Sequence, residues 1–224
     1  MRKILGRIPL KMKTAKKTGK IEKIKFSDGK SLFSLISDSP AVIGLCGQMA
    51  AGKNFVAEKL CSCSPEKCVS IDLDSTVHAA IKCLEPQILD AFSADAKKAG
   101  LVLQKEDGSI NRRALGALVF SSPALLKKQE NLVYPKTVFL VKQFLEENKG
   151  KTVLLNATVL YKTPELLNLC SKIYFVTAPF AKRLARARRR DGLSLCQILR
   201  RFNAQKNLLA EYKKTKIPLT LIKN

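Results

Sequence analysis

The segment Gly47-Gln48-Met49-Ala50-Ala51-Gly52-Lys53-Asn54 constrains the fold more strongly than any other part of the chain. It follows a short apolar run at residues 42–46 and precedes a helical pattern that begins at residue 55. A strand, a glycine-bounded loop ending in lysine and a helix form the context of a phosphate-binding P-loop. The backbone N–H groups of such a loop point toward phosphate oxygens, and the positive end of the helix dipole strengthens this attraction. The segment therefore predicts a nucleotide-phosphate site between a strand and a helix.

The loop matches the pattern G-x-x-x-x-G-K-[ST] at every defined position except the last, where Asn54 stands. Lys53 is expected to reach the outer phosphates of ATP. The usual Ser or Thr places a hydroxyl on Mg²⁺, and the carbonyl oxygen of Asn54 could ligate the same cation from a longer side chain. The predicted ATP-binding residues are Gly47, Ala50, Ala51, Gly52, Lys53, Asn54 and Phe55. The alternative is a strand–helix turn without a ligand, which does not explain the lysine at the position that the motif requires.

Composition and cysteine usage exclude several classes of protein. The chain has 224 residues, of which 46% are hydrophobic and 26% are charged, so it can bury the core of one domain. No stretch of about 20 apolar residues predicts a membrane helix. The basic N-terminus lacks the apolar segment of a secretory signal. The seven cysteines include no C-x-x-C pair, which favours free thiols in a reducing cytoplasm over disulfides or a zinc site.

The net charge of +23 is concentrated in two segments. Residues 1–30 contain eleven lysines or arginines against two acidic residues, and a second basic run covers residues 182–190. A basic tail is usually a solvated arm, so we expect residues 1–40 to form a partly disordered leader before a domain at residues 41–224. Met12 is an alternative start, and residues 26–36 could form a hairpin. The leader could contact nucleic acid weakly at low salt, but the absence of tryptophan and of a recognition motif argues against nucleic-acid binding as the main function.

Strand and helix patterns alternate after the loop, which predicts an α/β fold with a parallel sheet flanked by helices. Strands are expected at residues 42–46, 68–72, 152–155, 172–177 and 217–222, the last as an edge strand or with its proline at the strand start. Helices are expected from 76 with Asp74 or Ser75 as cap, at 112–120 with Asn111 as cap, and from 123. Further helices are expected at 135–150, from 163, at 179–190 and at 194–212.

Two carboxylates, Asp72 and Asp74, stand at the C-terminal end of the second predicted strand. Ligands of open α/β sheets bind beyond the C-terminal ends of the strands. Asp72 is the candidate general base that accepts the proton of an attacking hydroxyl, and Asp74 could support Mg²⁺ through water or contact the substrate. The alternative is that one aspartate caps the next helix while the other is solvated.

Arginines supply a second group of candidates. Arg186 and Arg190 lie four residues apart on one face of the predicted helix at 179–190, where they could clamp a transferring phosphoryl group. Gly192 at the end of this helix would let residues 179–194 move as a lid. Only one of Arg112 and Arg113 can face a site, because adjacent helical residues point about 100° apart. For each of these arginines, a solvated surface cation is the alternative.

These motifs, in this order, resemble those of the dephospho-CoA kinase family over residues 42–224. The segment Asp72-Leu73-Asp74 fits the family's D-x-D, and residues 107–115 fit its D-G-x-[IL]-N-R-x-x-L. The lid pattern R-x-x-x-R-D-G-x-S fits residues 186–194, and a family glutamine corresponds to Gln205. The resemblance implies a P-loop kinase fold with a helical substrate region at about 75–150 and a basic lid. It also implies Mg²⁺-dependent transfer of the ATP γ-phosphoryl group to the ribose 3′-hydroxyl of dephospho-CoA. The implied catalytic residues are Lys53, Asp72, Arg186 and Arg190, and the implied substrate contacts are Asp74 and Arg112.

Several positions depart from the family pattern. Besides Asn54, alanines at 50 and 51 replace a glycine and a serine of the loop, and Tyr134 replaces a histidine before Pro135. The family's L-D-x-P-L-L-[FY]-E reads Leu155-Asn156-Ala157-Thr158-Val159-Leu160-Tyr161-Lys162 here. Two alternatives therefore stay open: a degenerate nucleotide-binding protein without catalysis, and a kinase of another small nucleotide.

Overall fold

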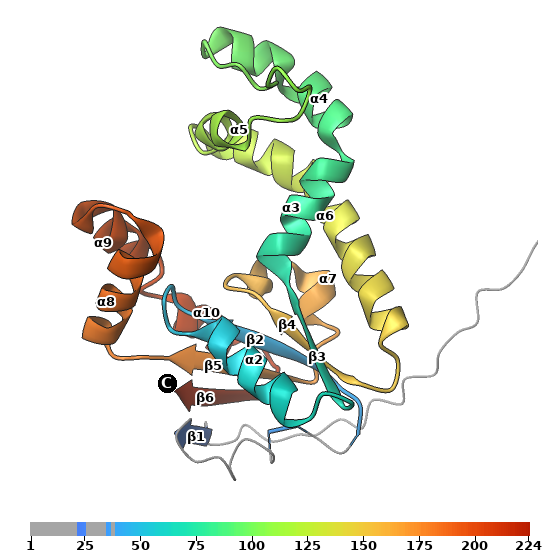
Figure 1. Cartoon of the computed structure of the whole chain (residues 1–224), viewed down its shortest axis with the longest axis vertical. Helices are drawn as coiled ribbons and strands as arrows, with labels where there is room; N and C mark the ends of the chain where they lie inside the picture. Colours follow the sequence, from blue (N-terminus) through green and yellow to red (C-terminus); the bar gives the residue numbers. More distant parts are fainter. Residues whose placement is uncertain (1–21, 26–34, 37–38) are drawn as a thin grey trace, which may run out of the picture.

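The computed structural model describes residues 22–25, 35–36 and 39–224. Within these residues a parallel sheet of six strands runs in the order β1-β6-β5-β2-β4-β3 (Figure 1). The strands are β1 Glu22–Lys25, β2 Val42–Gly47, β3 Cys68–Asp72, β4 Thr152–Asn156, β5 Lys172–Thr177 and β6 Leu219–Lys223. The predicted α/β fold with a parallel sheet is confirmed. Because all the strands run in one direction, their C-terminal ends share one edge of the sheet.

Helices cover both faces of this sheet. Helix α2 Lys53–Cys63 packs Val56 and Leu60 against one face. The opposite face is covered by α6 Pro123–Glu147, α7 Pro164–Leu167 and α10 Leu208–Lys214. A short 3-10 helix, η1 Leu160–Lys162, follows β4. Strand β4, between β2 and β3, is buried along its whole length, which explains its nearly continuous apolar sequence.

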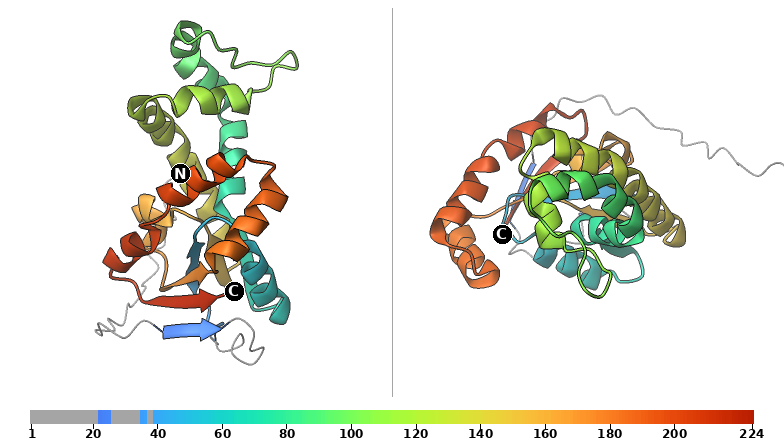
Figure 2. Two further views of the ribbon diagram at one scale, coloured as in Figure 1. Left: turned by 90° about the vertical axis from the view of Figure 1, so that its left-hand side faces the viewer. Right: turned by 90° about the horizontal axis from the view of Figure 1, so that it is seen from above.

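Two groups of helices extend beyond the C-terminal edge of the sheet (Figures 1 and 2). The first consists of α3 Leu73–Cys83, α4 Glu85–Lys98, α5 Arg112–Val119 and the first half of α6. It has its own apolar cluster, which includes Ile88, Phe92 and Leu115. The second consists of α8 Phe180–Asp191 and α9 Leu195–Ala204, and it packs Ala187, Ile198 and Phe202 against Met49 and Ala50 of the loop. Both groups therefore flank the predicted phosphate site.

Helix α6 contradicts the prediction of a separate helix from Pro135. It runs without interruption through Pro135, although proline removes a backbone hydrogen bond. The buried side chains of Val133, Val138 and Val141 lie on both sides of the proline, and they join the apolar cluster of α3–α5 to that of the sheet. Burial on both sides of Pro135 offsets the lost bond, so the proline does not start a new helix.

Two other boundaries differ from the sequence-based prediction. The helix after β3 begins at Leu73, and its cap is Asp72 rather than Asp74 or Ser75. The helix expected at 194–212 is two helices, α9 and α10, separated at Gln205. The proline before the last strand marks its start, and β6 lies between β1 and β5 rather than at the edge. The predicted cap Asn111 is confirmed by a hydrogen bond from a backbone N–H group, and Ser122 and Ser194 cap α6 and α9 in the same way.

Strand β1 lies inside the segment that the sequence predicted as a leader before the domain. It pairs in parallel with β6 from Glu22↔Thr220 to Lys25↔Lys223, and Ile24 packs against the apolar cluster beneath α2. Part of this segment is therefore an element of the sheet. The other residues of the predicted leader and hairpin, apart from 35–36 and 39–40, lie outside the described residues.

We expect removal of residues 1–25 to lower the melting temperature relative to removal of residues 1–21, because only the first truncation deletes β1. Burial of Ile24 contributes about 1–2 kcal/mol, and about 1 kcal/mol shifts Tm by roughly 2–4 °C in a chain of this size. Thermal unfolding of the two truncated proteins should differ by about 2–8 °C on this basis. Equal melting temperatures would mean that β1 contributes nothing to the stability of the sheet.

Candidate active site

The loop between β2 and α2 has the backbone conformation of a phosphate cradle. A Cβ atom on Gly47 would lie 2.5 Å from the carbonyl oxygen of Val176, so only glycine fits there. Gly52 has φ 94°, a left-handed conformation that glycine adopts without strain. Ala50 also has a positive φ, 59°, which costs about 1–3 kcal/mol in a residue with a side chain. Such strain clusters at ligand-binding loops, which supports a functional role for this one.

Side chains from the second helical group hold the loop in place. Gln205 Oε1 accepts a hydrogen bond from Met49 N at 2.6 Å, and Arg183 Nε donates to Met49 O at 2.9 Å. Arg183 is buried and also stacks over the ring of Phe202 at 4.2 Å. Burial lowers the pKa of this guanidinium. The interruption between α9 and α10 thus places Gln205 where it can fix one peptide group of the loop.

Lys53 is the first residue of α2, and its ammonium group lies at the centre of the site. Its Nζ atom donates to Thr158 Oγ1 at 3.0 Å and to Gly47 O at 3.4 Å. Burial lowers the pKa of Lys53, while the nearby carboxylates of Asp74 and Asp72 act in the opposite direction. Phosphate groups at this place would favour the charged form in the same way as these carboxylates.

Asp72 ends β3 and faces the same space as Lys53. Its Oδ1 atom accepts hydrogen bonds from Asp74 N at 2.9 Å and Ser75 N at 3.4 Å, so it caps α3. This capping leaves Oδ2 for another partner. Asp72 and Asp74 line a cavity of about 350 Å³ together with Lys53, Asn54, Asn156 and Arg190. The capping role considered from the sequence is therefore compatible with a second role in the site.

Asn54 and Asn156 form a hydrogen-bonded amide pair at the wall of this cavity. Asn156 Nδ2 donates to Asn54 Oδ1 at 2.8 Å, and Asn156 is 4% exposed. The pair joins the start of α2 to the end of β4, next to Asp72 on the neighbouring strand. The carbonyl oxygen of Asn54 has a second lone pair, which stays available for a cation. Among the described residues no three His, Cys, Asp or Glu side chains form a metal-ligand cluster.

The amide pair makes a prediction about substitutions at residue 54. We expect Asn54→Thr alone to lower activity, because the shorter side chain leaves the buried amide of Asn156 without its partner, a loss of about 1–3 kcal/mol. We expect Asn54→Thr with Asn156→Asp to recover activity, because a threonine hydroxyl can donate to a carboxylate. Steady-state kinetics and melting temperatures of the two single variants and the double variant test this coupling. Additive effects of the two substitutions would show that the residues act independently.

The basic helix α8 lines a second cavity next to the first. Arg186 and Arg190 line this space of about 510 Å³ with Gly52, Phe55 and Asn224, and Arg190 also lines the first cavity. Arg186 Nη1 and Asn224 Nδ2 both donate to the carbonyl oxygen of Ala51, at 3.3 Å and 2.9 Å. Ala50 and Arg190 line both cavities. Side chains from both cavities could therefore contact a phosphate chain bound to the loop.

Most of the residues proposed from the sequence come together here, and one does not. Arg112 is exposed in the first turn of α5 and lines neither cavity. Five contributors were not proposed as site residues: Asn156, Thr158, Arg183, Gln205 and Asn224. Their contacts join segments more than 100 residues apart, and a single sequence carries no direct signal for such pairs. For Gln205 the match to a glutamine of the family was the only indication.

Comparisons with known proteins identify relatives of this chain. The family model for dephospho-CoA kinase (CoaE) matches residues 41–224. Dephospho-CoA kinase from Treponema pallidum is 34% identical over 173 residues, which cover 76% of this chain and 80% of the relative. Dephospho-CoA kinase from Treponema denticola is 36% identical over 177 residues and 77% of each chain.

Solved structures support the fold. A crystal structure of TT1252 from Thermus thermophilus has a TM-score of 0.69 at 27% identity and covers 84% of this chain and 90% of its own. Dephospho-CoA kinase from Campylobacter jejuni, at 24% identity, has a TM-score of 0.58 over 82% of this chain and 87% of its own. The match of the family model over most of the chain, together with the two Treponema relatives, shows that the chain belongs to the dephospho-CoA kinase family.

Proposed function

We propose that this chain transfers the γ-phosphoryl group of ATP to the ribose 3′-hydroxyl of dephospho-CoA. The observation that carries the proposal is the convergence of Lys53, Asp72, Asp74 and Arg190 on one cavity beside the phosphate loop. Phosphoryl transfer needs positioned positive charge around the phosphates and a base for the attacking hydroxyl. The cavity contains positively charged side chains and a carboxylate that can act as the base. The identity of the two substrates follows from family membership.

In this proposal the loop amides and Lys53 hold the β- and γ-phosphates. Asp72 accepts the proton of the 3′-hydroxyl as the oxygen attacks the γ-phosphorus and the bond to the ADP oxygen breaks. Its Oδ1 is fixed by two backbone N–H groups, so the carboxylate has one defined orientation. Arg186 and Arg190 stabilise the charge on the transferring group from the lid side. Arg112 is proposed as a contact to the part of dephospho-CoA beyond the ribose, which requires the two helical groups to approach each other.

Mg²⁺ fits the oxygen groups of the site. Asn54 Oδ1, Asp72 and Asp74 are hard oxygen donors, and Mg²⁺ is usually bound through one or two protein carboxylates together with substrate phosphates and water. A bound Mg²⁺ would neutralise phosphate charge during transfer. We propose Asn54 as the residue that takes the place of the usual hydroxyl ligand, with Asn156 holding its orientation.

Purified protein with ATP and Mg²⁺ tests the proposal when ADP formation is measured with and without dephospho-CoA. We expect ADP formation that depends on dephospho-CoA. AMP and other nucleosides tested as acceptors distinguish a kinase of another small nucleotide. Binding of an ATP analogue without transfer to any acceptor identifies another candidate, a non-catalytic nucleotide binder. Asn54, Asn156 and Lys162 favour this candidate because they replace a hydroxyl residue and two carboxylates of the family pattern.

We further propose that the protein works in the cytoplasm. All seven cysteines are free thiols in the structure, including Cys61 and Cys68, whose sulfur atoms are only 3.4 Å apart. Free thiols at such a distance are typical of a reducing compartment. In the described part of the chain, no helix is long and apolar enough to cross a membrane.

A further inference from the structure

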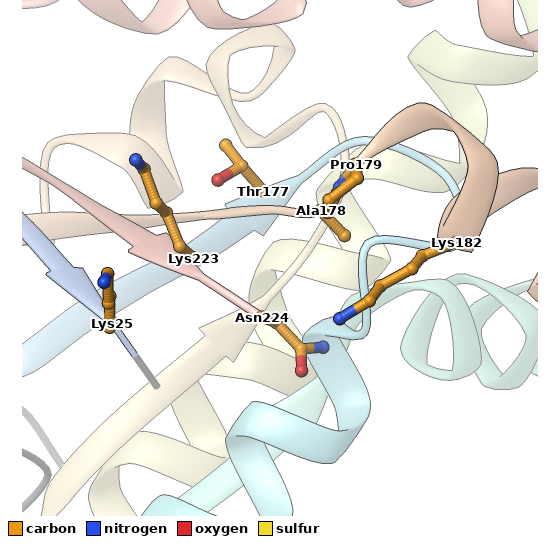
Figure 3. Close-up of a pocket in the computed structure, with 7 residues that line it drawn as sticks. All are labelled: Lys25, Thr177, Ala178, Pro179, Lys182, Lys223 and Asn224. Atoms are coloured by element: carbon orange, nitrogen blue, oxygen red, sulfur yellow. The ribbon is translucent and has the colours of Figure 1, made fainter. Parts of the chain in front are cut away.

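A third cavity, of about 610 Å³, lies at the C-terminal edge of the sheet on the far side of Asn224 from the phosphate loop (Figure 3). It is lined by the ends of three adjacent strands and the start of a helix: Lys25 of β1, Lys223 of β6, Thr177 of β5, Ala178, Pro179, Lys182 of α8 and Asn224. None of its lysines belongs to the site described above. Figure 3 shows Lys25 and Lys223 on neighbouring strands and Lys182 on the opposite side of the cavity.

The register of the sheet places two of these lysines directly beside each other. Lys25 pairs with Lys223 across β1 and β6, and Lys223 pairs with Thr177 across β6 and β5. Neighbouring strands lie about 4.8 Å apart. Like charges directly opposite each other on adjacent strands are destabilising. Both side chains are exposed, so solvent screens part of this repulsion, and an anion bound beside them would offset the rest.

The surroundings of the pair add positive potential. Lys182 comes from the first turn of α8, whose N-terminus has no side-chain cap and no acidic residue in its first turn. The unpaired N–H groups of that turn carry the positive end of the helix dipole. No aspartate or glutamate of the described chain lines the cavity. Three lysines and a helix N-terminus thus line one space without a carboxylate to balance their charge.

We propose that this cavity is an accessory binding site for the phosphate group of a small phosphorylated molecule, held by Lys25, Lys223 and Lys182. A cavity of about 610 Å³ is within the usual size range of small-molecule sites, about 300–1,000 Å³. The three lysines line one cavity instead of following a stripe along the surface, which distinguishes the site from a nucleic-acid track. The C-terminal edge of a parallel sheet is also where such folds bind ligands.

The site is joined to the phosphate loop through one residue. Asn224 lines both this cavity and the cavity beneath Arg186, and its side chain donates to Ala51 O of the loop. Its backbone N–H donates to Thr177 O, which is also at the accessory site. An anion held beside Asn224 would stabilise the end of β6 that contacts the loop. The proposal is independent of the acceptor substrate, because it concerns lysines outside the catalytic cavity.

Calorimetric titration with inorganic pyrophosphate tests the site. The full chain is first saturated with Mg²⁺ and a non-hydrolysable ATP analogue, which fills the catalytic site, at a constant ionic strength of about 0.15 M. We expect one remaining pyrophosphate site per chain. The affinity of this site for pyrophosphate should fall about fivefold, or about 1 kcal/mol, in each of the variants Lys25→Ala, Lys182→Ala and Lys223→Ala. Lys23→Ala is the matched control, because Lys23 lies on the same strand and face without lining the cavity.

A melting experiment supplies a second readout that does not depend on the nucleotide. Pyrophosphate should raise Tm of the wild type more than that of the Lys25→Ala and Lys223→Ala double variant. The proposal is overturned if the ATP analogue abolishes the remaining pyrophosphate site, since the cavity would then belong to the nucleotide site. Equal weakening by Lys23→Ala would overturn it too, because the binding would reflect overall charge. Binding of a short single-stranded RNA at this site in place of pyrophosphate would assign the lysines to nucleic acid instead.

Discussion

Lys53→Ala should lower kcat/KM by about 10²–10³-fold, the range measured when one preorganised charge-stabilising donor is removed from an active site. The Lys53 ammonium is half-buried, donates to Thr158 and Gly47, and lies among Asp72, Asp74 and Arg190. In the ATP complex it would exchange these partners for phosphate oxygens, whose charge grows as the bond to ADP breaks. Alanine removes that charge and cannot replace it.

The fold should survive this substitution, because alanine is a good helix residue at the start of α2. Circular dichroism and Tm check this point. Lys82→Ala is the control: it removes the same charge from an exposed position on α3 that lines none of the three cavities. A kcat/KM of the Lys53→Ala variant within about twofold of the wild type would mean a loss of less than about 0.5 kcal/mol of transition-state stabilisation. That result would contradict the proposal that this loop binds ATP.

Asp72→Asn should reduce kcat by about 10²–10⁴-fold with little change in the KM for ATP, since a positioned general base contributes a factor of this size. The structure shows that Asp72 also caps α3, and the substitution to asparagine can keep this cap. Asparagine caps helices as well as aspartate does, so Oδ1 keeps its bonds to Asp74 N and Ser75 N and α3 keeps its start. The substitution removes the proton acceptor and the negative charge near Lys53 but keeps the helix cap, so effects on rate are separated from effects on stability.

Asp74→Asn is the matched comparison, because it removes the same charge from the same cavity two residues away. Asp74 does not supply the capping oxygen of α3, and we expect its replacement to affect the Mg²⁺ requirement more than kcat. If the deficit in kcat follows Asp74→Asn and is absent from Asp72→Asn, the two roles must be exchanged. If Asp72→Asn lowers Tm by many degrees, the residue is a structural cap whose kinetic effect is indirect.

Local patterns in the sequence predicted the parts of this fold that depend on neighbours along the chain. The loop from Gly47 to Asn54, the strand ending at Asp72 and the cap at Asn111 each rest on residues within one turn or strand. Parallel topology then brings the ends of β2, β3 and β4 to one edge, which is why the candidate site could be assembled from separate motifs.

The features that sequence-based prediction missed depend on contacts between residues that are far apart along the chain. Pro135 was expected to start a helix, but α6 continues because its buried valines pack on two apolar clusters at once. Strand β1 has a single apolar residue, Ile24, between lysines, and only its pairing with β6 makes it a strand. The Asn54–Asn156 pair joins two departures from the family pattern that seemed unrelated along the chain. Together they form one hydrogen-bonded unit, which is a physical reason to read them as a coupled change.

We expect this divergent site to transfer a phosphoryl group to the ribose 3′-hydroxyl of dephospho-CoA. The most direct measurement identifies the product formed from dephospho-CoA, ATP and Mg²⁺ by mass spectrometry and by phosphorus NMR, with the Lys53→Ala protein as a blank. We expect a product with one added phosphate on the ribose 3′-oxygen, one ADP for each product molecule, and a kcat of the order of 1–100 s⁻¹, as is usual for kinases. Tight binding of ATP without any phosphorylated product, or a phosphate placed on another hydroxyl, would contradict the proposed function.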